Sequence, residues 1–296
     1  MRRRVGRKGA GGVPARPPGD RRGSGRGRRT HAECDAARRA LRPAGARLAR
    51  GAEPVSDLHL IIDTSTRHGA VGLHDGAAMI RSEAWLSRHN HTAELLPAID
   101  HLLAAQGATV DLLRGIAVAR GPGGFSALRA GLGVAKGFAF ARGIPLVGVS
   151  TLEATAYPLR DVGLPICALL EAGQGAVAWA RFEQRAGGWR RATPERVTPL
   201  DRMLGKGGRR LLFCGEGASR YRGEIEAVAG ARARFVDGAP HMRLRGVAEL
   251  GVARLARGES DAVASLEPRY LRPPGITPAK ATTAVKLGAA PRAMSM

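Results

Sequence analysis

The segment best suited to binding a phosphate is the glycine-rich stretch GPGGFSALR, which follows a predicted strand and opens a predicted helix. We call its small residues the glycine loop: Gly121, Gly123, Gly124 and Ser126. Backbone N–H groups at a helix start attract anions. A Walker loop, however, needs a Lys directly after its glycines, and the first Lys here is Lys136, well inside the helix. A dinucleotide-binding loop needs a third glycine where Ser126 stands. The spacing therefore argues against both nucleotide motifs and leaves simple anion binding open.

Other reactive side chains form no clear catalytic or metal-binding set. His89 and His91 are two residues apart at a helix start, a spacing that does not turn both rings to one side. We expect surface or capping roles for them and no metal site. Ser126 also stands at a helix start, where N-capping explains it better than a nucleophilic role. The three cysteines are far apart and in no CxxC or Cys/His cluster, which favours a reducing cytosolic setting.

Composition narrows the class of protein. The chain has 296 residues, of which 44% are hydrophobic, and a formal net charge of +22. Residues 1–56 hold 16 Lys and Arg against 4 Asp and Glu, so the remainder is too mildly basic to indicate a nucleic-acid surface. No apolar run approaches the ~18 residues of a membrane span, and the Arg-rich start lacks the apolar core of a secretory signal. We therefore expect a cytoplasmic protein with no membrane contact.

Residues 1–56 are rich in Arg, Gly, Pro and Ala, a composition that buries too little apolar area to order the chain. We expect this extension to be disordered. It is either an arm that grips RNA phosphates or a segment that is not natively translated. We favour the second interpretation because periodic sequence begins abruptly after Val55, which could be an alternative bacterial start. Residues 277–296 are expected to fray.

Hydrophobic periodicity predicts an α/β fold with two similar subdomains, residues 57–158 and residues 159–276. The first begins with a three-stranded antiparallel meander whose second hairpin carries the turn signal Asp75-Gly76. Its later elements are expected at 92–105 (helix), 116–119 (strand), 126–141 (helix closed by Gly143), 145–149 (strand) and 152–157 (helix). The second subdomain repeats the meander with a Gly-Gly hairpin and ends in strands at 211–214 and 233–237 and a helix at 247–257. The shared order suggests an internal duplication.

The helix that follows the glycine loop carries two flanks of small residues. Ala127, Gly131 and Ala135 recur every four residues on one flank, and Gly133 and Gly137 lie on the next. An interior glycine costs ~1 kcal/mol relative to Ala, so a close backbone neighbour is expected to compensate. That neighbour is either the protein's own sheet and preceding helix or a helix of another chain.

Three stretches resemble the bacterial TsaB family: LIIDTSTRHGAVGLHDG, HNHTAELLPAIDHLL and, most specifically, GPGGFSALRAGLGVAKGFAFARGIPLVGVSTLEA. PRYLRPP near the end fits the same family, so the resemblance covers about residues 58–275. It implies an actin-like, sugar-kinase-like (ASKHA) ATPase fold with a mixed sheet and flanking helices in each subdomain. It also implies that this chain is the non-catalytic partner of the subunit TsaD and that the ATPase TsaE docks on the pair. That complex transfers threonylcarbamoyl from its adenylate to N6 of the tRNA adenosine beside the anticodon.

The resemblance also assigns expectations to residues. The TsaD interface is expected on a helix bundle that includes Leu95, Leu96, Ile99, Ala127, Gly131 and Ala135. A homodimer is possible in isolation. In active ATPases of this fold, the turn occupied here by Asp63, Thr64 and Ser65 addresses phosphate and Mg²⁺. Without a second acidic residue in a corresponding loop, we expect a degenerate phosphate turn in which Asp63 caps the backbone.

The family implies that this chain alone holds no catalytic residue, metal or cofactor, and that ATP, Mg²⁺ and a catalytic metal belong to partner subunits. The sequence departs from the family at the glycine loop, where Gly124, Ser126 and Ala127 stand for Ser, Thr and Gly, and at the turn EAGQG, whose role is in doubt. The alternative is a self-sufficient nucleotide-dependent phosphotransferase of the same fold. Binding of ATP with Mg²⁺ by the isolated chain separates the two hypotheses.

Overall fold

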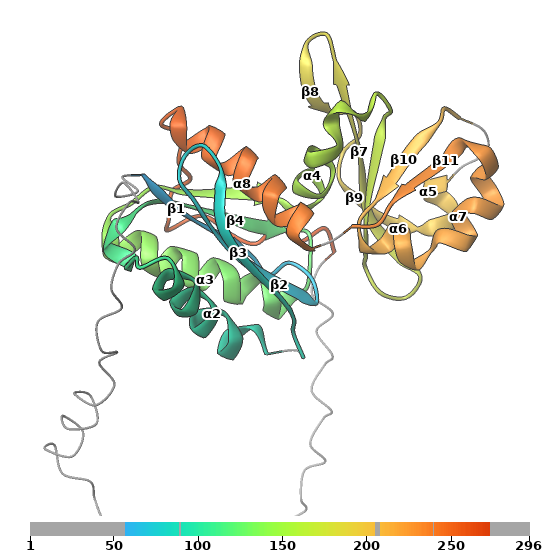
Figure 1. Cartoon of the computed structure of the whole chain (residues 1–296). Coiled ribbons are helices and arrows are strands. Elements are labelled where there is room, and N and C mark those ends of the chain that lie inside the picture. The colour runs from blue at the N-terminus through green and yellow to red at the C-terminus, as the bar shows by residue number, and fades with distance from the viewer. Residues whose placement is uncertain (1–56, 89, 205–207, 239, 273–296) are drawn as a thin grey trace, which may run out of the picture. The chain divides into compact units, whose positions relative to one another are not determined.

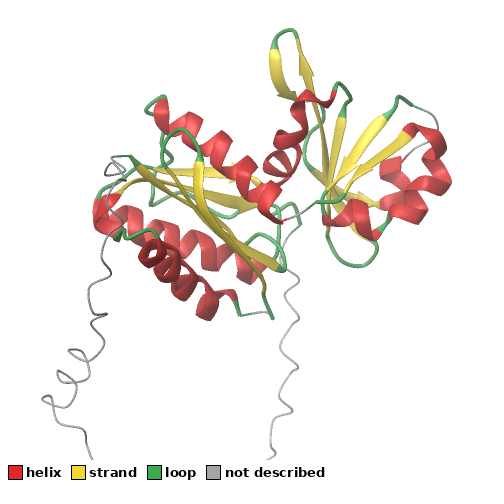
Figure 2. Ribbon diagram, in the orientation of Figure 1, coloured by secondary structure: helices red, strands yellow, loops and turns green. Residues whose placement is uncertain are grey.

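Two β-sheets with helices packed on their faces organise the described chain (Figures 1 and 2). The structure is a computed structural model that describes residues 57–88, 90–204, 208–238 and 240–272. The extension expected at residues 1–56, the tail at 277–296 and His89 all lie outside the described residues.

The first sheet combines an antiparallel meander with two parallel strands. Its strands are β1 (Leu58–Asp63), β2 (His68–His74), β3 (Met79–Leu86), β4 (Leu113–Gly121) and β5 (Leu146–Ser150), in the spatial order β3-β2-β1-β4-β5. The meander β1 to β3 is antiparallel, whereas β4 pairs parallel with both β1 and β5. The meander and the parallel β4–β5 pair were predicted, from the apolar runs and from the helix that separates the last two strands; the pairing of β4 with β1 was not predicted.

Helices cover both faces of this sheet. They are α2 (His91–Ala105) and α3 (Phe125–Arg142) on one face and α8 (Pro240–Ala256) on the other, with a 3₁₀ turn at Val110–Leu112. Leu60 and Ile62 of β1 pack in the core under α2 and α3, whereas Ile61 packs in the core under α8. Burial on both faces explains why β1 reads as a continuous apolar run and not as an alternating one.

The helix boundaries agree with the predicted ones to within one residue for α2 and α3. α3 ends at Gly143, whose φ of 63° is the left-handed conformation that favours glycine at this position. α2 continues through Pro97. The N-cap of α3 is Gly124, and Ser126 lies inside the helix with no capping hydrogen bond at its start. The predicted capping role of Ser126 is therefore wrong, because the helix begins one residue earlier than expected.

The second sheet has the order β11-β10-β6-β7-β8, with β9 also paired to β7. Its strands are β6 (Ile166–Glu171), β7 (Ala176–Arg185), β8 (Gly188–Arg191), β9 (Arg196–Pro199), β10 (Leu211–Cys214) and β11 (Ala233–Val236). The helix α4 (Thr151–Ala156) and the 3₁₀ turn Tyr157–Val162 border one face. The opposite face packs against α5 (Leu200–Leu204), α6 (Glu216–Arg220) and α7 (Arg222–Ala229), with a 3₁₀ turn at Gly230–Arg232.

The two sheets repeat one topology. In each, three antiparallel strands in chain order are followed by two parallel strands that extend the sheet from the first strand of the meander. The spatial orders β3-β2-β1-β4-β5 and β8-β7-β6-β10-β11 therefore correspond strand by strand. This correspondence supports the internal duplication that the sequence suggested.

Two expectations about connections need correction. The hairpin at Asp75 spans residues 75–78, and the Asp75 carboxylate accepts the N–H groups of Ala77 and Ala78, so it is not a two-residue turn. The helix predicted at 247–257 begins at Pro240 and packs on the first sheet, although it follows the second sheet in sequence. Leu244, Val247 and Val252 complete the core on the face of the first sheet that α2 and α3 leave open.

Candidate functional site

The glycine loop packs directly on the degenerate phosphate turn. The N–H of Gly124 donates to the carbonyl oxygen of Ser65 at 2.9 Å. A Cβ placed on Gly123 would lie 2.1 Å from that same oxygen, so only glycine permits this approach. One N–H that could have faced an anion is thus already bonded within the chain. This close packing on Ser65 is enough to explain why glycines stand here, so the glycines are not evidence for a bound phosphate.

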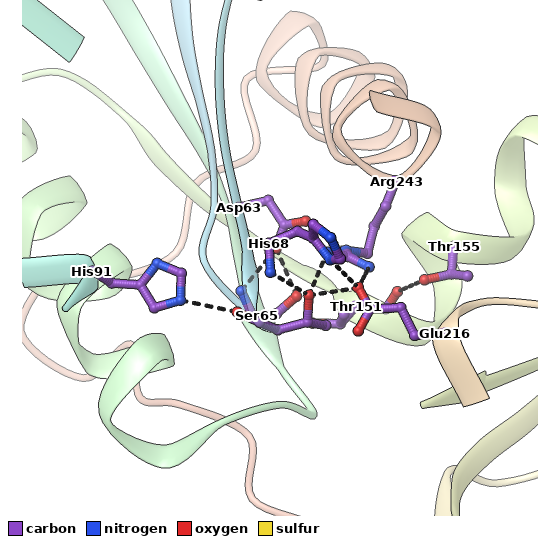
Figure 3. Close-up of polar contacts among 9 residues, drawn as sticks. Asp63, Ser65, His68, His91, Thr151, Thr155, Glu216 and Arg243 are labelled. Carbon is purple, nitrogen blue, oxygen red and sulfur yellow. Dashed lines mark hydrogen bonds and ion pairs between the residues drawn. The ribbon is translucent and has the colours of Figure 1, made fainter. Parts of the chain in front are cut away.

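Asp63 is fully buried at the centre of the turn, with both of its carboxylate oxygens bonded (Figure 3). Oδ1 accepts the Ser65 N–H at 2.9 Å and the Ser65 hydroxyl at 2.6 Å, which is the expected capping role. Oδ2 accepts from Nε of Arg243, a residue of α8, at 2.5 Å. This second partner was not predicted from the sequence.

Arg243 is a buried cation, and each of its three guanidinium nitrogens donates a hydrogen bond. Its side chain also donates from Nη1 to Oε1 of Glu216 at 3.2 Å and from Nη2 to the Thr66 hydroxyl at 2.9 Å. Burial acts to lower the pKa of Arg243, but the charges of Asp63 and Glu216 outweigh it, so the pKa lies above its ordinary value. The guanidinium therefore stays charged although only 3% of the residue is exposed.

Glu216, at the start of α6, contacts the other polar side chains around the turn through its carboxylate (Figure 3). Its Oε1 accepts from the Thr66 hydroxyl at 2.7 Å and lies 3.2 Å from Nδ1 of His68. Nε2 of His91 lies 2.9 Å from the Thr66 carbonyl oxygen, which makes His91 a structural residue of this turn. Within residues 57–88, 90–204, 208–238 and 240–272, no three His, Cys, Asp or Glu side chains are arranged to hold a metal ion.

This arrangement does not fit a Mg²⁺ site of the kind that active ATPases of the fold place here. Mg²⁺ needs carboxylate oxygens that are free to coordinate it with near-octahedral geometry. Both oxygens of Asp63 already accept hydrogen bonds, and a guanidinium takes the position beside Oδ2 where a cation would bind. The site therefore carries its own internal cation.

A cavity of about 500 Å³ adjoins the turn and the glycine loop. Its wall includes Ser65, His91, Phe125 and three residues of the glycine loop, Gly123, Gly124 and Ser126. Its charged lining consists of one arginine, Arg67, and two glutamates, Glu171 and Glu216. A polyphosphate needs a surplus of positive charge, which this lining does not supply.

The structure places most of the predicted interface residues inside the chain. Leu95, Ile99 and Ala135 are fully buried in the core of the first sheet. A Cβ on Gly131 would lie 2.3 Å from the hydroxyl of Thr64, which itself donates to the carbonyl oxygen of Ala127 at 2.7 Å. The flank of Ala127, Gly131 and Ala135 thus packs on the chain's own phosphate turn. The predicted assignment of this flank to a partner interface is corrected, because Gly131 and Ala135 are buried within the chain. Ala127 is only partly exposed.

The other flank of α3 is open. A Cβ on Gly133 or Gly137 would meet no atom within 4 Å, and Phe140 is 84% exposed. Leu96 of α2, the one predicted interface residue with a large exposed surface, is 49% exposed. We call Leu96, Gly133, Gly137 and Phe140 the exposed helix face. The sequence signal for it was present in Phe140, a large aromatic side chain among small residues.

Arg243 and Glu216 are residues of this site that were not predicted from the sequence. Arg243 precedes the buried Leu244 and lies on the side of α8 that faces the first sheet. A charged residue on the buried side of an amphipathic helix is the available signal, because such a residue needs a partner.

Among the described residues, no helix is both long and apolar enough to span a bilayer.

Comparison with known proteins gives consistent matches. Residues 85–275 match the family model described as TsaD: tRNA N6-adenosine threonylcarbamoyltransferase. The chain is 30% identical over 217 residues to the tRNA threonylcarbamoyladenosine biosynthesis protein TsaB of Bacillus subtilis, a match that covers 72% of this chain and 93% of that relative. It is 33% identical over 132 residues to the Escherichia coli protein of the same name, covering 44% of this chain and 56% of the relative.

One further relative carries the transferase name, and one solved structure shows the fold. A tRNA N6-adenosine threonylcarbamoyltransferase of Pelobacter propionicus is 36% identical over 135 residues, but the match spans 39% of this chain and only 40% of that protein. The solved structure of YeaZ from Pseudomonas aeruginosa superposes with a TM-score of 0.59 at 26% identity, covering 73% of this chain and all of that one. Together with the two duplicated mixed sheets, these matches confirm the predicted ASKHA fold.

Proposed function

Because the chain belongs to the TsaB family, we propose that it is the non-catalytic scaffold subunit of the tRNA N6-adenosine threonylcarbamoyltransferase complex. Its place in tRNA threonylcarbamoyladenosine biosynthesis follows from the family. In this proposal the complex transfers threonylcarbamoyl from its adenylate to N6 of the adenosine next to the anticodon. This chain supplies no reacting group to that step.

One observation carries the non-catalytic part of the proposal. Asp63, which stands where an active ATPase of this fold addresses phosphate and Mg²⁺, is paired at both oxygens and neutralised by Arg243. Binding Mg²⁺–ATP would require this buried pair to break, and breaking such a pair costs several kcal/mol. In this proposal ATP, Mg²⁺ and a catalytic metal bind to the partner subunits.

The exposed helix face is the proposed docking surface for TsaD. Gly133 and Gly137 would let a partner helix approach the backbone of α3 closely, and Phe140 and Leu96 would bury apolar area on contact. The same face would allow a homodimer of the isolated chain. TsaE would dock on the heterodimer of this chain and TsaD. tRNA is then the substrate of the assembled complex.

Three measurements test this proposal. Calorimetry of the isolated chain with ATP and Mg²⁺ should give no saturable binding in the micromolar range, whereas co-expression with TsaD of the same genome should yield a stable heterodimer. Addition of the chain should restore tRNA modification to an extract that lacks it. Micromolar affinity for Mg²⁺–ATP would overturn the scaffold proposal and favour a self-sufficient phosphotransferase.

A further inference from the structure

A second cavity, of about 410 Å³, lies on the face of the second sheet that α5 and α7 cover. Its walls come from β7, β10, α5, α7 and the turn at Gly230–Arg232. One part of the lining is apolar, with Met203, Phe213 and Val228. The rest is charged, and the functional site described above uses none of it.

The charge of this lining is strongly asymmetric. It contains three arginines, Arg181, Arg209 and Arg232, and one acidic residue, Glu183. The carboxylate of Glu183 already accepts hydrogen bonds from Arg185 at 2.8 Å and from Arg190 at 2.9 Å. It is therefore not available to neutralise the three arginines that line the cavity.

Arg181 is the best-defined of these arginines. It lies on β7 directly opposite Cys167 of β6, and its guanidinium carbon lies 5.6 Å from the centre of the Trp179 ring. Its Nε is shielded from solvent and has no hydrogen-bond acceptor among the described residues. Burial raises the pKa of the Cys167 thiol to about 12, so that neighbour offers no negative charge. A buried guanidinium N–H without an acceptor is costly and calls for an anionic partner.

The other two arginines also lack acidic partners within the described part of the chain. Arg232 donates to the carbonyl oxygens of Val228 and Ala229, at 3.2 and 3.1 Å, which fixes its side chain at the end of α7. These contacts hold the guanidinium in place without neutralising it. Arg209 is exposed and forms no ion pair with a described residue. The cavity is thus built around positive charge that the described residues do not balance.

We propose that this cavity binds a small organic phosphate through Arg181, Arg209 and Arg232. A phosphate monoester carries a charge of about −1.5 to −2 at neutral pH, which the three unneutralised arginines of the cavity can balance. Guanidinium groups bind phosphate oxygens in paired hydrogen bonds, and the apolar wall would cover the organic part of the ligand. The volume lies within the ~300–1,000 Å³ typical of small-molecule sites. This site is separate from the proposed TsaD surface and does not depend on it.

The test uses AMP as the probe, adenosine as the uncharged control and the full chain at physiological ionic strength. Calorimetry should show saturable 1:1 binding of AMP and none of adenosine. Arg181→Met should weaken AMP binding by roughly tenfold to a hundredfold, the effect expected for a lost charge-assisted contact. Arg196→Gln is the matched control, because Arg196 also lies over the Trp179 ring, at 6.0 Å, but does not line the cavity. It should leave AMP affinity unchanged.

A second readout separates binding from folding. AMP should change the fluorescence of Trp179, and Trp179→Phe should remove that change. Arg181→Met should keep the melting temperature of the wild type, because the Arg181 side chain forms no ion pair with a described residue and its shielded Nε has no acceptor there. Equal AMP affinity in the wild type and Arg181→Met would overturn the proposal and assign the binding to other basic residues. Absence of AMP binding, or binding of tRNA alone, would overturn it as well.

Discussion

Nε of Arg243 lies 2.5 Å from Oδ2 of Asp63, in a buried ion pair that joins helix α8 to the turn after β1. Oδ1 of the same carboxylate accepts from Ser65, and the Arg243 guanidinium also contacts Thr66 and Glu216. The pair therefore completes the hydrogen bonding of the turn from a residue 180 positions away in sequence. It also leaves neither oxygen of Asp63 free of a hydrogen-bond donor.

Removal of the cation alone should destabilise the fold strongly. Arg243→Met leaves the Asp63 carboxylate buried without a countercharge, which typically costs about 3–5 kcal/mol. Urea denaturation should show this loss in the free energy of unfolding. Arg245→Met, which removes an exposed partner of Glu249 on the same helix, should change stability little. The double variant Asp63→Asn/Arg243→Met should recover part of the loss, and strict additivity of the two single losses would contradict the coupling.

The two flanks of α3 should respond in opposite ways to added side chains. Gly131→Ala places a methyl group against the Thr64 hydroxyl and should destabilise the chain by ~1–3 kcal/mol, the usual cost of overpacking. Gly133→Ala meets open space and should stabilise the helix by up to ~1 kcal/mol. Thermal unfolding of the two variants checks both signs. A stabilised Gly131→Ala protein would contradict the packing of this flank on the turn.

The exposed flank should determine TsaD binding. Gly137→Leu should keep or raise the melting temperature of the isolated chain, because no atom lies near the added side chain. At a helix–helix interface the same leucine should weaken binding by roughly tenfold to a hundredfold. Phe140→Asp should weaken it as well. Pull-down with TsaD measures the effect, with Val228→Asp on the distant α7 as an exposed apolar control; unchanged binding by both α3 variants would refute this surface.

Acidification should destabilise the chain through two histidines of the first sheet. His59 and His74 lie directly opposite each other on β1 and β2, and burial lowers the pKa of each below the ordinary value of 6.5. The unfolded chain then binds more protons below pH 6.5, so this stabilisation is complete above that pH and is lost as the pH falls through the lowered pKa values. Nearby Asp57, Asp75 and Glu249 moderate the effect.

Urea midpoints measured across this pH range check the histidine prediction. The midpoint should fall as the pH drops below about 6.5, the value for an unfolded histidine. The variant His59→Gln/His74→Gln should show a smaller fall over the same range. An equal fall in the variant and the wild type would assign the acid sensitivity to other groups.

Residues 2–54 should be dispensable for folding and for partner binding. The composition of this segment predicts no buried core, so its deletion should leave the melting temperature and the TsaD pull-down unchanged. A large loss of melting temperature would show that the segment packs on the domain. A loss confined to tRNA affinity, steepest at low salt, would support an RNA-binding arm.

The sequence by itself determined the local elements and the repeated order of strands. Apolar runs, the helical spacing of α2 and the glycine after α3 are signals within a few residues, and each gave the correct element type. The two meanders could be recognised because the strand period and the turn residues repeat in both halves. The largest boundary error is at the start of α8, which begins at Pro240 and not at Val247 as predicted.

The tertiary structure alone decided which surfaces of these elements are used. Both flanks of α3 consist of small residues, so sequence could not tell that Gly131 meets Thr64 while Gly133 faces open space. Nor could it place α8 on the first sheet, because the missing cover of that sheet is a non-local property. Arg243 reaches Asp63 only through that placement. Local periodicity records which residues are buried, but pairing between distant segments follows from how the sheets and helices fill space together.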